Sequence, residues 1–98
     1  MKQAAVHIGI QTLELYIPAS NSLKTKRRVL KSFKDRIKHK FNVSISEIAE
    51  HDKWQRALLG VAMISNDKAL IEKVFGDLCH LAGTLPEAEL LHHGVEFV

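Results

Sequence analysis

The hydrophobic pattern of the chain switches between the two-residue period of strands and the 3.6-residue period of helices, and it completes that cycle twice within 98 residues. Alternation over residues 4–17 gives way to a helical stripe over 23–40. Two strand-like segments follow at 42–49 and 57–64, then a helical stripe over 69–82 and a last strand at 89–98. Few folds accommodate this order of elements.

Two strand-helix-strand halves of similar length predict an α+β fold, the ferredoxin-like βαββαβ two-layer sandwich. Its four antiparallel strands form one layer, and both helices cover one face of the sheet. With 98 residues, 46% of them hydrophobic, the chain has enough apolar surface for one such core and not for two. Residues 1–98 are therefore expected to form a single domain.

The first strand changes its apolar phase along its length. Its apolar residues are even-numbered as far as Ile10 and odd-numbered from Leu13 to Ile17. A β-bulge near Gln11-Thr12 would produce such a change, and we expect one there.

The third strand, Ala-Leu-Leu-Gly-Val-Ala-Met-Ile at residues 57–64, is apolar on both faces. It is therefore expected in the middle of the sheet. One face of the sheet carries no helix in this fold, so these residues indicate that the open face is covered by something else. A second copy of the chain is the commonest cover, and a bound ligand or nucleic acid is less common.

Charge is unevenly distributed along the chain. Residues 24–40 contain nine of the fourteen basic residues and one acid, Asp35, which gives this segment a net charge of +8. The rest of the chain has five basic and ten acidic residues and a net charge of −5. Such a separation indicates an anionic partner more clearly than the overall charge of +3 does.

On a helical wheel, six basic residues of this segment share an arc of about 120° opposite the apolar stripe. Lys26 falls on the apolar side, where its stem is expected to extend past the sheet edge. A face that serves only solubility usually mixes charges of both signs. The arc therefore predicts contacts with phosphates. Its members are Lys24, Arg27, Arg28, Lys31, Lys34 and Lys38.

The segment 51–56, His-Asp-Lys-Trp-Gln-Arg, joins the second and third strands. Arg56 has a planar donor fork suited to phosphate or carboxylate, and Trp54 has a ring on which a base can stack. The structural alternative places Trp54 over the open sheet face or in a dimer contact. We take Trp54 and Arg56 as secondary candidates for nucleic-acid contacts.

Four stretches together resemble the YlxP-like family of small bacterial proteins. They are Ser-Leu-Lys-Thr-Lys-Arg-Arg at residues 22–28, Phe-Asn-Val-Ser at 41–44, Trp-Gln-Arg at 54–56 and Ser-Asn-Asp at 65–67. The resemblance covers nearly the whole chain and implies a ferredoxin-like fold. Genes of this family often lie beside those of a ribosome-binding factor and a translation initiation factor. The family brings no catalytic residues to this chain.

Several classes of site have no support in the sequence. No Ser or Cys nucleophile has the spacing of a catalytic triad, and no two histidines form the i, i+4 pair of helical zinc sites. Acylphosphatase has a similar size and order of elements, but its glycine-rich phosphate loop has no counterpart near residues 15–18. We therefore expect no enzyme activity, no catalytic residues, no metal and no cofactor.

The expected location is cytoplasmic. Cys79 is the single cysteine, apolar runs are too short to cross a bilayer, and the N-terminus lacks the apolar core of a signal peptide. The sequence thus predicts a non-enzymatic module that binds structured RNA, ribosomal or pre-ribosomal, through a basic helix. The alternative is a dimeric protein-interaction or regulatory module that uses the open sheet face.

Overall fold

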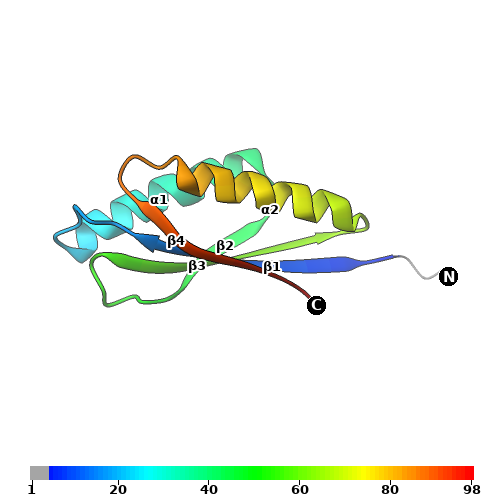
Figure 1. The fold of residues 1–98 in the computed structure, drawn as a ribbon, viewed down its shortest axis with the longest axis horizontal. Coiled ribbons are helices and arrows are strands. Elements are labelled where there is room, and N and C mark those ends of the chain that lie inside the picture. The colour runs from blue at the N-terminus through cyan, green and yellow to red at the C-terminus, as the bar shows by residue number, and fades with distance from the viewer. Residues whose placement is uncertain (1–4) are drawn as a thin grey trace.

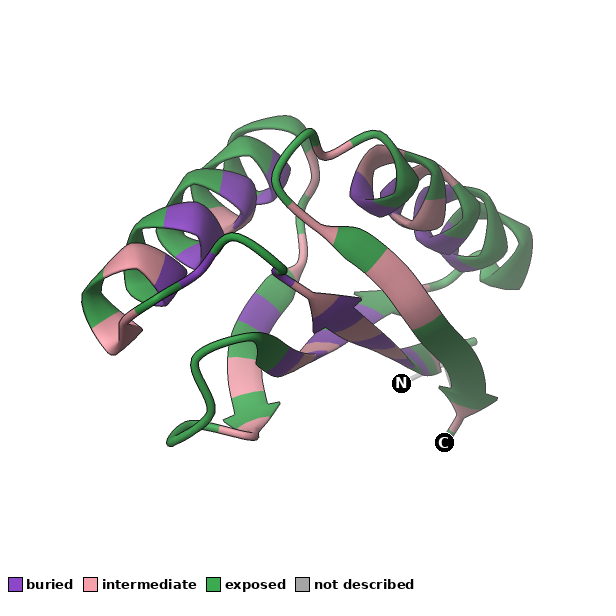
Figure 2. Ribbon diagram, turned by 60° about the vertical axis from the view of Figure 1, so that its left-hand side comes forward, coloured by how far each residue is buried: buried purple, intermediate pink, exposed green. Residues whose placement is uncertain are grey.

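The computed structural model describes residues 5–98 and has the expected order of elements (Figure 1). Four strands form one antiparallel sheet in the order β2-β3-β1-β4, and both helices lie on the same face of it (Figure 2). This is the ferredoxin-like α+β sandwich. The elements are β1 (His7–Tyr16), α1 (Leu23–Lys40), β2 (Ser44–Ala49), β3 (Arg56–Ser65), α2 (Lys68–Gly83) and β4 (Glu89–Phe97).

Both helices begin at side-chain caps. The Ser22 hydroxyl accepts a hydrogen bond from the Thr25 N–H at 3.1 Å, and the Asp67 carboxylate accepts one from the Ala69 N–H at 3.0 Å. These caps satisfy amide groups that have no partner within the helix. Each helix then turns one apolar stripe to the sheet, as the buried colour in Figure 2 shows. The buried apolar residues of the helices are Val29, Leu30, Phe33, Ile37, Ile71, Val74, Phe75, Leu78 and Ala82.

The packing of α2 on β1 is tight at Gly9. A Cβ atom there would lie 2.6 Å from Ile71 Cγ2 and 2.8 Å from Phe75 Cε2. Only a residue without a side chain permits α2 to pack this closely on the strand.

The bulge expected near Gln11-Thr12 is absent, so that prediction was wrong. β1 pairs with β3 in unbroken register from His7 to Tyr16, and the one irregularity beside β1 lies between Glu14 and Leu15 on the β4 side. The apolar phase changes because the two halves of β1 use different faces. Ile8 and Ile10 lie on the open face, whereas the odd-numbered residues from Leu13 onward face the helices and are buried.

The third strand is central, as predicted, because β3 lies between β2 and β1. Its neighbour β2 is short and has a register shift between Glu47 and Ala49. The shift turns Ile48 toward Gly60 on the open face, where a Cβ at Gly60 would lie 3.0 Å from Ile48 Cγ2.

β4 is an edge strand that the helices only partly cover. His93 and Val95 occupy positions that face the helix layer, since they pair with the inward residues Leu13 and Gln11. Both nevertheless remain exposed, and Val95 keeps 50% of its surface. A hollow is therefore left between β4 and α2. Over residues 5–98, neither helix is long and apolar enough to cross a membrane.

Candidate nucleic-acid interface

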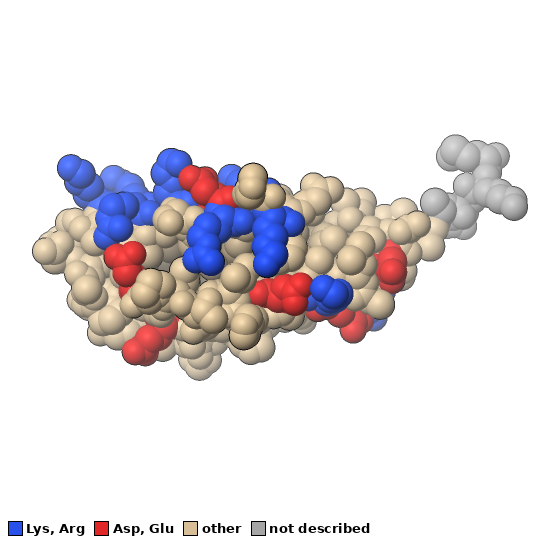
Figure 3. Space-filling model, turned by 90° about the horizontal axis from the view of Figure 1, so that it is seen from above, with Lys and Arg blue, Asp and Glu red and all other residues tan. Residues whose placement is uncertain are grey.

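The basic residues of α1 lie on the surface as the wheel predicted. Five of the six arc residues are exposed and Lys34 is half-buried. Figure 3, which looks down on the helix layer, shows basic side chains gathered along one side with little acidic surface between them. Arg36 is also exposed and lines a shallow hollow with Arg28 and Lys31, although it was not among the predicted residues. On the wheel it lies about 80° beyond the edge of the arc at Arg28 and beside the buried Val29, so the arc did not include it.

Two of the arc residues pair with acids. Lys31 Nζ lies 2.7 Å from the Asp35 carboxylate, and Arg28 Nη2 lies 3.0 Å from Glu87 Oε2. The hydrogen bond to Lys31 lowers the pKa of Asp35, and the same bond raises the pKa of Lys31. All four side chains are more than 45% exposed, so water screens both pairs and an incoming phosphate can replace either acid.

The other four arc residues form no ion pair within the part of the chain that the structure describes: Lys24, Arg27, Lys34 and Lys38. They run from the first to the last turn of α1. At 1.5 Å per residue, this distance is about 20 Å, enough to meet several phosphates of a nucleic-acid backbone.

Lys26 does not extend past the sheet edge as expected; its side chain is buried, with 1% of its surface exposed. The ammonium group lies 2.8 Å from Glu47 Oε2 on β2 and donates a 2.6 Å hydrogen bond to the Glu50 carbonyl. Glu50 has a φ of 68°, in the left-handed region, at the turn after β2. Lys26 thus fixes the first turn of α1 against β2 and is not available to a partner.

Trp54 is exposed in the β2–β3 connection, with 54% of its surface open to solvent. The connection is held to the end of β1 by a 2.8 Å hydrogen bond from the Ile17 N–H to the Gln55 carbonyl. A second bond, of 3.0 Å, runs from the Gln55 side chain to the Pro18 carbonyl. Trp54 therefore stands on an anchored loop, and within one chain it is not part of the core.

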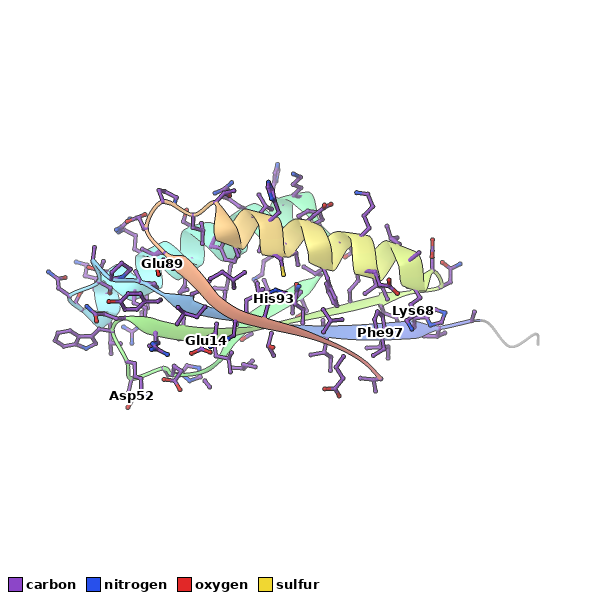
Figure 4. The ribbon with its side chains drawn as sticks, viewed as in Figure 1. Glu14, Asp52, Lys68, Glu89, His93 and Phe97 are labelled. Carbon is purple, nitrogen blue, oxygen red and sulfur yellow. The ribbon has the colours of Figure 1, made fainter. Side chains whose placement is uncertain are left out.

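Arg56 and the basic arc lie on opposite faces of the sheet. Arg56 alternates with the inward Ala57 and pairs with Glu14 through a 2.9 Å contact to Oε1. Figure 4 shows Glu14 and Asp52 on the side away from the helices. The structure therefore does not bring Arg56 together with α1. In β3, Arg56 shares its phase with Leu58 rather than with the buried Ala57 and Leu59. Because both faces of this strand are apolar, the sequence did not show which face Arg56 would occupy.

The described residues contain no group of three or more His, Cys, Asp or Glu side chains placed to hold a metal ion. His92 and His93 pair with Glu14 and Leu13, which face opposite sides of the sheet.

The fold and the arc define a class: a ferredoxin-like α+β domain with one strongly basic helix. The chain belongs to a family described as protein of unknown function (DUF503), whose sequence pattern matches residues 8–95. It is 42% identical over 82 residues to the uncharacterized protein YlxP of Bacillus subtilis (strain 168), and the match covers 84% of this chain and 89% of that protein. The resemblance inferred from the four motifs is thereby confirmed.

Two solved structures share the fold at low sequence identity. The de novo designed protein Foldit4 superposes with a TM-score of 0.57 and 14% identity, over 94% of this chain and 96% of the designed one. A C-terminal segment of the alpha subunit of aIF2 from Pyrococcus abyssi gives 0.50 and 13% identity, over 98% of this chain and 51% of that one. Both likenesses concern the fold alone.

Proposed function

We propose that this protein binds structured RNA, ribosomal or pre-ribosomal, in the cytoplasm through the basic arc of α1. The observation that carries the proposal is the line of four exposed or half-exposed cations that have no acidic partner among residues 5–98, next to two more whose partners are solvent-exposed. Double-stranded RNA is recognised mostly through its shape and backbone, which a rigid row of cations suits. The gene neighbours implied by the family resemblance support a ribosomal RNA.

The other helix shows that the arc is specific to α1. The exposed charged residues of α2 include Lys73, which pairs with Asp77 at 3.2 Å, and Lys68 and Glu72, whose charges cancel. A domain that needed charge only for solubility would have no reason to concentrate cations on one helix.

The test is binding to purified ribosomal subunits and their precursors, measured by co-sedimentation across a salt series. Each cation that neutralises a phosphate releases a counterion and contributes about 0.9 to the slope of log K against log[salt]. We expect the Arg27→Gln/Lys38→Gln variant to bind more weakly and to reduce the slope by roughly 1.5 to 2.

The matched control is Lys68→Gln/Lys73→Gln on α2, which changes the net charge by the same amount. This variant is expected to bind like the unmodified protein. Equal weakening by both variants would show that only net charge matters and would contradict an interface on α1. A lack of binding at low salt would remove the proposal altogether.

Self-association through the open sheet face is a second candidate function, since it would create a dimeric interaction module. Four isoleucines on this face remain exposed in a single chain, at 37–66% of their surface: Ile8, Ile10, Ile48 and Ile64. A hollow of about 370 Å³ at the start of β2 adjoins two of them, Ile8 and Ile64. Monomeric proteins rarely leave a contiguous apolar patch of this kind open to water.

Analytical ultracentrifugation distinguishes this candidate from the first. A face-to-face dimer should dissociate on dilution, depend little on salt, and be lost in an Ile64→Lys variant. Leu70→Lys is the control, because Leu70 is 43% exposed on α2 and lies away from the open face. A monomer at every concentration contradicts the dimer and leaves the RNA proposal intact.

A further inference from the structure

The edge of β4 that faces away from β1 is free. The strand pairs only with β1 and runs along one side of the sheet, with no other strand beyond it (Figure 2). The Val98 N–H donates a 2.9 Å hydrogen bond to the Ile8 carbonyl. Because antiparallel partners alternate between bonded and non-bonded pairs, Glu96 and Gly94 also turn their backbone groups toward β1. The backbone groups of the alternate residues therefore point outward: His93, Val95 and Phe97.

These outward N–H and C=O groups are open to a partner. No backbone group of another element within residues 5–98 bonds to them. The helix layer does not close over the strand either, because a cavity of about 420 Å³, the α2–β4 cavity, separates Phe75 of α2 from Val95 and Phe97. A row of unpaired backbone groups at a sheet edge is a template on which another strand can pair.

The two edges of the sheet differ in how they are protected. Natural edge strands are blunted by shortness, by irregular pairing, or by Lys and Pro. The opposite edge strand, β2, has six residues and a register shift. β4 has nine residues without Lys, Arg or Pro, and its one irregularity lies near its start, opposite Glu14 and Leu15. From His92 onward the edge is regular, so β4 is the edge at which a further strand can add.

The residues of β4 are complementary to a second copy that runs antiparallel. A two-fold axis at Gly94 places His93 opposite the partner's Val95, and their outward groups then exchange N–H···O bonds. The same register places His92 opposite the partner's Glu96, where an imidazole N–H donates to the carboxylate. His92 and Glu96 both lie on the open face, since they pair with Glu14 and Ile10. An axis at Glu96 would instead oppose two carboxylates.

From this geometry we propose that β4 pairs with β4 of a second copy of the chain about a two-fold axis at Gly94, which joins the two four-stranded sheets into one. The partner's strand then covers one side of Val95, which is 50% exposed in a single chain. The basic arc stays free, because α1 lies over the β2 side of the sheet and α2 over the β4 side. The interface rests on neither function proposed above.

A proline substitution tests the interface without disturbing the fold. Val95→Pro removes an N–H that points outward, so the β1–β4 ladder keeps its hydrogen bonds while each chain of the dimer loses one donor. Analytical ultracentrifugation should show a dimer whose dissociation constant rises about thirtyfold or more in Val95→Pro. Val95→Thr, which keeps the N–H and a β-branched side chain, and Ile64→Lys on the open face should leave the dimer in place.

A disulfide tests the register. The Cα atoms of the two Gly94 residues face each other as a non-hydrogen-bonded pair about 4.5 Å apart, within the span of a disulfide. A Cβ at Gly94 lies 3.4 Å from Thr12 Oγ1, an ordinary contact. In a Cys79→Ala background, Gly94→Cys is expected to form disulfide-linked dimers under mild oxidation. The control Glu96→Cys, on the same face, places its two Cα atoms about 14 Å apart and should not crosslink.

Three results would overturn the proposal. They are a monomer at every concentration, association of Val95→Pro as tight as that of Val95→Thr, and crosslinking of Gly94→Cys no faster than that of Glu96→Cys. A dimer that is lost in Ile64→Lys and retained in Val95→Pro would assign self-association to the open sheet face. Urea denaturation of Val95→Pro confirms that a loss of association is not a loss of folding.

Discussion

The burial of Lys26 leads to a prediction about stability. Lys26→Met keeps an unbranched apolar side chain of similar length, so the packing of the first turn of α1 is retained. The change removes the hydrogen bond to the Glu50 carbonyl and leaves the Glu47 carboxylate, which is 17% exposed, without its cation.

The expected loss follows from those two contacts. A charge-assisted hydrogen bond contributes about 1.5 kcal/mol, and an uncompensated, mostly buried carboxylate costs about 1 kcal/mol or somewhat more. We therefore expect Lys26→Met to lower the free energy of unfolding by roughly 2 to 3 kcal/mol. Urea denaturation followed by far-ultraviolet circular dichroism measures this quantity.

A double-mutant cycle separates the ion pair from packing. Glu47→Gln should destabilise the unmodified protein but restore about 1 kcal/mol in the Lys26→Met background, because no charge is then left unpaired. Lys53→Met, which breaks the exposed pair with Glu50, should leave the urea midpoint unchanged. Strict additivity of the Lys26 and Glu47 changes, or a loss below about 0.5 kcal/mol for Lys26→Met, would refute the reasoning.

Three further results are expected. Gly9→Ala should lower the free energy of unfolding by about 1–3 kcal/mol in a denaturant titration, because its methyl group overlaps α2. The pKa of the Asp35 carboxyl, measured by carbon-13 NMR, should lie below 3.8 and return toward 3.8 in Lys31→Met. Because the folded-state pKa is depressed, the contribution of Asp35 to stability is present above pH 3.8. This contribution is lost as the pH falls through the folded-state pKa. Cys79 should react with iodoacetamide more slowly than free cysteine at neutral pH, by mass spectrometry, because its thiol pKa is raised.

The features that sequence alone predicted are those with a local signature. The range of α1 agreed with its apolar stripe, and the exposure of the basic arc followed from the wheel. The central place of β3 followed from its two apolar faces. In each case, the residues that carry the signal are neighbours in the chain.

The features that were missed depend on contacts between distant segments. Lys26 is buried because Glu47 comes near it from β2, and nothing in either segment signals that pairing. The apolar phase change in β1 led to the wrong prediction of a bulge, because the hydrophobic pattern of a strand does not show which of its faces the helices cover. The α2–β4 cavity was not predicted for a similar reason: it is formed between two segments that are distant in the chain, and Val95, which lines it, remains exposed.

The pairing of β1 with β4 has a consequence for how the protein is made. β1 pairs with β4 from Gly9–Phe97 to Tyr16–Glu89, so this edge of β1 stays unpaired until the last strand has been synthesised. At 5–20 residues per second, that interval lasts roughly 4 to 15 s. Throughout it, one edge of β1 has unpaired amide and carbonyl groups beside the exposed Ile8 and Ile10. Release of a chain that stops short of β4 would make this edge permanent, and we expect such fragments to aggregate.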